Sequence, residues 1–118
     1  MRRSFAALLL LFALLVPATA LAAEYLSAIA DLPLATGLRD EAEKATVFDT
    51  PLGKVVNAYA SGNVAPQAVL DFYDAKLPGL GWERQSSGTY HRKKETLKID
   101  VAGPAEGPTH VSYTLSSQ

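Results

Sequence analysis

The two histidines, His91 and His110, are the side chains best suited to binding a metal or transferring a proton. Both fall at positions that the strand pattern directs toward solvent. A zinc site takes about four ligands, and Asp100 or Glu95 could supplement the histidines, but no spacing fixes such a set. The sequence therefore predicts two solvated sheet residues, no metal site and no cofactor.

Nucleophiles and general acids are equally scattered. No serine stands in a Gly-x-Ser-x-Gly turn, and the absence of cysteine excludes thiolate chemistry. Asp71 and Asp74 share one face of a predicted helix, but its polar neighbours keep that face in water. A catalytic carboxylic acid needs burial or a close like charge to raise its pKa. We therefore expect no enzyme, and an exported enzyme is only the third alternative.

Aromatic residues concentrate near the predicted helix. Phe72 and Tyr73 have helical spacing with other apolar residues, and Trp82 follows a glycine turn, so packing in the core is the favoured interpretation. The alternative is a groove between helix and sheet that binds a lipid or another small apolar molecule. Its lining would be Tyr59, Phe72, Tyr73 and Trp82.

Basic residues cluster at a predicted hairpin tip formed by Arg92, Lys93 and Lys94, with Lys98 nearby. Lysines at such a turn keep it soluble and discourage strand-to-strand aggregation, which is the favoured interpretation. The alternative is weak contact with anionic lipid headgroups or an acidic protein surface.

The first residues predict export. Arg2 and Arg3 precede an apolar run over 5–16, and small residues follow, which is the pattern of a secretory signal peptide over 1–22. We expect cleavage after Ala22 or Ala23, because the apolar run is shorter than the roughly 20 residues that span a bilayer. The mature protein is expected in the periplasm or secreted.

Composition limits the partners of the mature chain. Nine basic and twelve acidic residues remain without Arg2 and Arg3, a net charge of −3. Neither this charge nor the compartment favours a nucleic-acid partner. A chain of this length suits one small domain, whose stability must come from packing because it has no disulfides.

The positions of prolines and the spacing of apolar residues predict the elements that position these residues. Residues 23–44 are predicted to form an extended apolar arm. Pro66 and Pro78 bracket a helix over 66–77. Apolar and polar residues alternate in the later strands, so the sheet has one polar face. Six strands are expected, over 45–49, 54–61, 82–85, 89–93, 96–102 and 109–116. The fold class is α+β, with a single domain over 45–118 in which one helix packs on an antiparallel sheet of about four to six strands.

Several motifs resemble a group of small exported proteins of Gram-negative, mainly alphaproteobacterial, type. They are Ala30-Asp31-Leu32-Pro33-Leu34 with Gly37-Leu38, Val47-Phe48-Asp49-Thr50-Pro51 with Gly53-Lys54, and Phe72-Tyr73 with Leu77-Pro78-Gly79-Leu80-Gly81-Trp82. The resemblance implies a β-α-β-β domain in the periplasm. It implies no catalytic residue and no ligand.

The leading functional expectation is a non-catalytic accessory or interaction domain in the periplasm or outside the cell. Its partner would be a periplasmic or envelope protein, bound by Leu32, Leu34 and Leu38 of the arm or by the edge of the last strand. The alternative is the apolar-ligand carrier described above. Membrane contact is expected only through the signal peptide or weakly through the basic hairpin tip.

Overall fold

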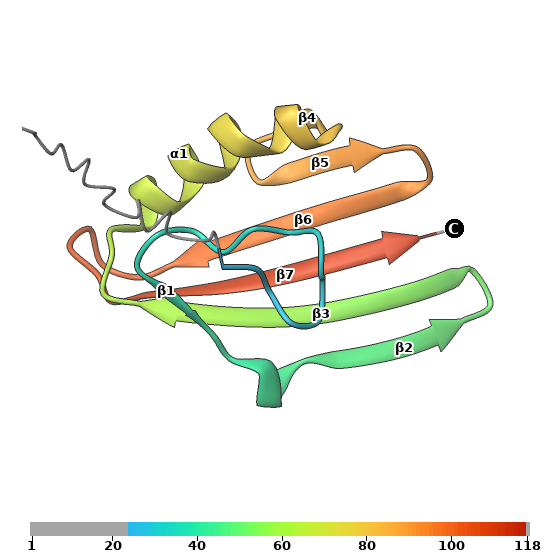
Figure 1. Ribbon diagram of the computed structural model, residues 1–118, viewed down its shortest axis with the longest axis horizontal. Helices are drawn as coiled ribbons and strands as arrows, with labels where there is room; N and C mark the ends of the chain where they lie inside the picture. Colours follow the sequence, from blue (N-terminus) through green and yellow to red (C-terminus); the bar gives the residue numbers. More distant parts are fainter. Residues whose placement is uncertain (1–23, 118) are drawn as a thin grey trace, which may run out of the picture.

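An antiparallel sheet of seven strands, covered on one face by a helix and an N-terminal arm, makes up the fold (Figure 1). The computed structural model describes residues 24–117, so the predicted signal peptide over 1–22 lies outside the described residues. The elements are β1 (Leu38–Asp40), η1 (Ala42–Lys44), β2 (Thr46–Thr50), β3 (Gly53–Gly62), α1 (Pro66–Lys76), η2 (Leu77–Leu80), β4 (Glu83–Ser86), β5 (Thr89–Arg92), β6 (Glu95–Ala102) and β7 (Thr109–Ser117). The α+β class and the antiparallel sheet are confirmed.

Strand order in the sheet is β1-β3-β7-β6-β5-β4, and β2 also pairs with β3. Two short strands therefore share one side of β3, with β1 opposite 60–62 and β2 opposite 53–57. The central strand β7 lies between β3 and β6. The expected four to six strands become seven because residues of the arm form β1.

Register confirms the alternation of apolar and polar residues. Ala58, Tyr113 and Ile99 lie opposite one another on β3, β7 and β6, and all three are buried. Their chain neighbours point to the other face, which remains open and is largely polar. One face of the sheet thus needs a cover and the other does not.

The helix supplies part of that cover. Pro66 occupies the first turn of α1, where its missing N–H is not needed. Val69, Tyr73 and Leu77 follow at intervals of four residues and are almost fully buried against the sheet. The chain then tightens into the 3-10 turn η2, which contains Pro78, and Gly81 ends it with a φ of 92°.

The arm supplies the rest of the cover. It crosses in front of β7 and β3, while α1 lies along the half of the sheet with β4, β5 and β6 (Figure 1). Its backbone is held by hydrogen bonds from Leu26 N to Leu32 O and from Leu34 N to Glu24 O. The apolar side chains of the arm that are buried in the core are Leu26, Ile29, Leu32, Leu34, Ala35 and Leu38.

This burial corrects two expectations. Residue 45 is not a boundary between arm and domain, because the arm contributes both core side chains and a strand. Leu32, Leu34 and Leu38 are at most 8% exposed, so they offer too little exposed area to bind a partner protein. Without the arm, the apolar face of β3 and β7 would be in water, which explains why these leucines turn inward. Among the described residues, no helix has the length and apolar character needed to cross a membrane.

Candidate interaction surfaces

The histidines are not brought together. His91 lies on β5 opposite Thr96, and its Nδ1 is 3.2 Å from the Thr96 hydroxyl. His110 lies on β7 opposite Ala102, toward the other end of the sheet. Within residues 24–117, no three His, Cys, Asp or Glu side chains are grouped to hold a metal.

The helix carboxylates make separate contacts instead of forming a pair. Asp71 accepts a hydrogen bond of 2.9 Å from Gln67 Nε2. Asp74 accepts one from the Tyr90 hydroxyl and is 3.2 Å from Arg84 Nε. Burial, and then the bond to Asp74, raises the pKa of Tyr90. Asp74 therefore fastens α1 to β4 and β5.

Tyr73 connects the helix to both the arm and the sheet. Its hydroxyl donates to Pro33 O at 2.8 Å and accepts from Ala35 N–H at 3.3 Å. The Tyr113 hydroxyl lies 2.8 Å away. Since the single proton of Tyr73 goes to Pro33, Tyr113 must be the donor in the tyrosine pair. Burial raises the pKa of Tyr73 to about 12.

The alternative interpretation, an aromatic groove between helix and sheet, does not hold. Tyr73 and Trp82 are at most 3% exposed, and they fill the core instead of lining a cavity. Tyr59 lies opposite Ser112 on the open face of the sheet, away from the helix. Of the four residues named for that groove, Phe72 lines the cavity between helix and arm, and the other three do not.

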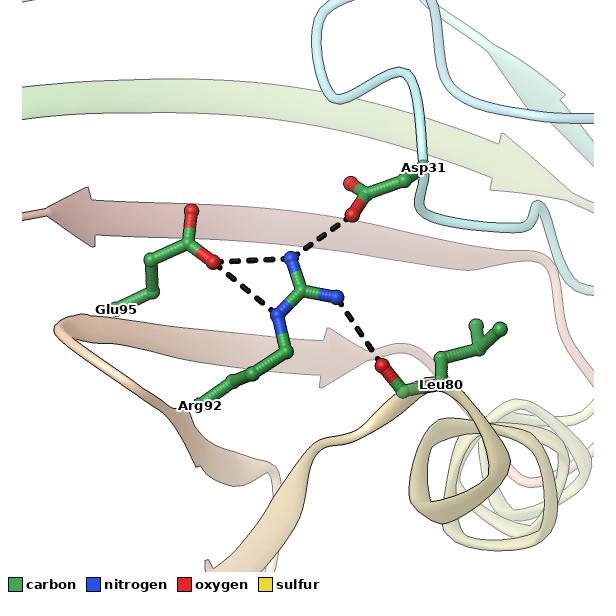
Figure 2. Close-up of polar contacts among 4 residues, drawn as sticks. All are labelled: Asp31, Leu80, Arg92 and Glu95. Carbon is green, nitrogen blue, oxygen red and sulfur yellow. Dashed lines mark hydrogen bonds and ion pairs between the residues drawn. The ribbon is translucent and has the colours of Figure 1, made fainter.

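Arg92 joins the arm and η2 to the β5–β6 hairpin (Figure 2). Its guanidinium donates to Asp31 of the arm at 2.8 Å, to Glu95 at 2.9 Å and to Leu80 O at 3.2 Å. It also stacks over the Trp82 ring, 4.2 Å from the ring centre. Burial lowers the pKa of Arg92, but the hydrogen bonds to the two carboxylates outweigh this and raise it.

The basic cluster is consequently divided. Arg92 is engaged on the covered side, whereas Lys93 and Lys94 are exposed in the β5–β6 turn, where Lys93 has a φ of 54°. Lys98, in β6, lies opposite Thr114 of β7 and points to the open face. The four residues therefore do not form one patch.

Exposed apolar side chains mark two other surfaces that sequence reasoning missed. Five large apolar residues among 24–117 are strongly exposed, namely Tyr25, Val47, Phe48, Leu52 and Leu80. Three belong to β2 and the turn after it, and we call these the β2 surface. The other two border the cavity between arm and helix.

The β2 surface lies at an edge of the sheet. All five residues of β2 are exposed, and the strand pairs with β3 alone. Val47 and Phe48 point to opposite faces and are 57% and 52% exposed, and Leu52 in the turn is 84% exposed. Strands rich in β-branched and aromatic residues pair well, so this edge favours the addition of another strand.

The opposite edge has the reverse character. β4 consists of Glu83, Arg84, Gln85 and Ser86, all exposed, and its register with β5 shifts between Arg84 and Ser86. Short, charged and irregular edges discourage pairing with another chain. The contrast makes β2 the edge at which a partner strand would add.

The second surface is a groove of about 650 Å³ between the arm and α1–η2. We call it the arm groove. Its lining consists of Glu24, Tyr25, Pro33, Leu34, Ala35, Thr36, Gly37, Leu38, Phe72, Lys76, Gly79 and Leu80. Most of these side chains are apolar, and one acidic and one basic residue are present.

Comparison of the chain with protein-family models, with curated proteins and with solved structures finds no match.

Proposed function

We propose that the protein is a non-catalytic interaction domain, periplasmic or secreted, that binds an extended segment of another envelope protein along β2. The observation behind the proposal is the unpaired edge of β2 with Val47, Phe48 and Leu52 exposed. A strand that adds to such an edge gains backbone hydrogen bonds, and pockets for alternate side chains give specificity.

The side chains of β2 indicate what the added segment must contain. Val47 and Phe48 lie on opposite faces, so neighbouring residues of the partner would each contact an apolar side chain. Asp49 is next along the edge, and its cross-strand neighbour on β3 is Lys54. An extended segment of β-branched or aromatic residues without proline matches this edge.

Support for export comes from the sequence alone. The signal-peptide pattern over 1–22 and the resemblance to exported β-α-β-β domains favour the periplasm or secretion. The proposal of a non-catalytic role rests on the separation of the two histidines and on the contacts of Asp74 with Tyr90 and Arg84. The partner-binding surface expected on the arm or on the edge of the last strand is replaced by β2, because the arm leucines are buried and β7 lies between β3 and β6.

A peptide library displayed on phage tests the proposal with the purified protein. We expect enrichment of extended, β-branched sequences, whose binding weakens at least tenfold in Val47→Lys, because an edge lysine discourages strand addition. Gln85→Lys makes a similar change on β4 and should leave binding intact. Circular dichroism confirms that both variants fold. If no sequence is enriched, or if Val47→Lys binds the selected peptides as well as the wild type does, β2 is not the docking site.

A further inference from the structure

The arm groove has the dimensions and surface of a small-molecule site. Its volume of about 650 Å³ lies within the roughly 300–1,000 Å³ usual for ligand pockets. Tyr25 and Leu80, 49% and 40% exposed, border it from the arm and from η2. Exposed apolar residues that gather at a hollow mark a binding surface more strongly than the same residues scattered singly.

The helix wall of the groove is firmly held. Phe72 packs edge-on against Tyr73, with ring centres 5.0 Å apart and planes at 88°. Tyr73 is itself fixed by its hydrogen bonds to the arm and to Tyr113. Lys76 follows Phe72 by one helical turn, and its Nζ lies 5.9 Å from the centre of the Phe72 ring. The groove therefore places one ammonium group above a rigid apolar surface.

The arm wall excludes a strand as the occupant. Leu34 N–H already donates to Glu24 O at 2.7 Å, and Tyr25 and Pro33 form a bridge of their own. Pro33 also lacks an N–H. Since these backbone groups are occupied or missing, an added peptide would find no ladder of hydrogen bonds there. A small apolar molecule fits this wall better than a second polypeptide segment does.

The charged residues of the groove lining indicate what charge one end of such a molecule would carry. Lys76 is the basic residue of the lining and Glu24 the acidic one. Within residues 24–117, no carboxylate forms an ion pair with Lys76. An anionic group bound above Phe72 would give this ammonium a partner, while the chain of the ligand covers Leu80 and Tyr25.

We propose that the arm groove binds a single-chain amphiphile with an anionic head group, its apolar chain along Phe72 and Leu80 and its head group at Lys76. This site shares no residue with β2, so it is independent of the proposed peptide docking.

Calorimetric titration with dodecanoate and with dodecyltrimethylammonium, each below its micelle concentration, tests the assignment. We expect dodecanoate to bind more tightly by roughly fivefold, as befits a partly exposed ion pair. Lys76→Glu should reverse the order of the two probes. Lys98→Glu makes the same charge change on the open face and should preserve it. Leu80→Asp should abolish saturable binding of both.

The contrary results are equally definite. Absence of saturable binding by either probe overturns the site. Binding whose order is unchanged in Lys76→Glu overturns the head-group assignment, and binding that survives Leu80→Asp places the ligand elsewhere. Thermal unfolding of each variant shows whether it is folded, and the Lys76→Glu result does not depend on Leu80→Asp. Peptide binding at β2 is unaffected by any of these outcomes.

Discussion

Replacing Tyr73 by phenylalanine should destabilise the protein far more than the same change at Tyr113. The Tyr73 hydroxyl makes three hydrogen bonds, to Pro33 O, Ala35 N and the Tyr113 hydroxyl. Its loss leaves all three partners without that bond in a buried environment. Tyr113→Phe removes a single donor, and Tyr73 keeps its bonds to the arm.

The magnitude follows from the number of unpaired groups. A buried polar group left without its partner costs about 1–3 kcal/mol. With three such groups, partly compensated by relaxation and water, Tyr73→Phe should lower the free energy of unfolding by about 3 kcal/mol. Tyr113→Phe should cost about 1 kcal/mol. For a domain of this size, 3 kcal/mol corresponds to a fall in Tm of roughly 15 °C.

Urea unfolding of the two single variants and the double variant provides the assay. The double variant should cost about 1 kcal/mol less than the sum of the single variants, because Tyr113 no longer leaves an unpaired hydroxyl. Equal costs for Tyr73→Phe and Tyr113→Phe would refute the three-bond role of the Tyr73 hydroxyl, and strict additivity would refute the bond between the two tyrosines. In hydrogen-exchange experiments, the backbone amides of the arm should exchange faster in Tyr73→Phe but not in Tyr113→Phe.

Two further predictions concern pH and close backbone contacts. Burial raises the pKa of Tyr73 from 10.0 to about 12 and also raises that of Tyr113. The two tyrosines therefore contribute their full stabilisation below pH 10 and lose it as the pH rises toward 12. Urea unfolding across this range should show a falling free energy of unfolding, and a constant or rising value would contradict the prediction. Gly62→Ala should lower the free energy of unfolding by more than about 2 kcal/mol, because the new Cβ would lie 2.0 Å from the carbonyl oxygen of Gly37. The Cβ of Gly79→Ala meets no atom within 4 Å, so that variant should be neutral. Equal Tm values for the two variants would show that the backbone around Gly62 shifts at little cost.

Local pattern was enough to predict most elements of the sheet and helix. Alternation in 96–102 and 109–116 corresponds to β6 and β7, and Pro66 marks the start of α1. The apolar arc that contains Tyr73 and Leu77 is the buried face of the helix. These features depend on neighbours within a few positions, which is the range that periodicity and turn residues describe.

The arm and the two surfaces depend on contacts across long stretches of sequence. Tyr73 bonds to Pro33 over 40 positions, and Arg92 reaches Asp31 over 61. No periodicity in 23–44 signals that the arm leucines cover β3 and β7. Alternation also does not specify which strand lies at the edge of the sheet. The exposure of Val47 and Phe48 therefore depends on the pairing order of the strands, which local pattern does not predict.

The central position of β7 has a consequence for how the chain folds. β3 and β6 meet only through this strand, which is the last element in the described sequence. Every pairing that unites the two halves of the sheet must therefore wait until residues 109–117 are available, and such distant pairings form slowly because long loops must close first. In a chain threaded N-terminus first through a narrow export channel, these two halves would stay separate until residues 109–117 emerged. The topology thus suits translocation in an extended state, because the two halves of the sheet cannot join before residues 109–117 have crossed.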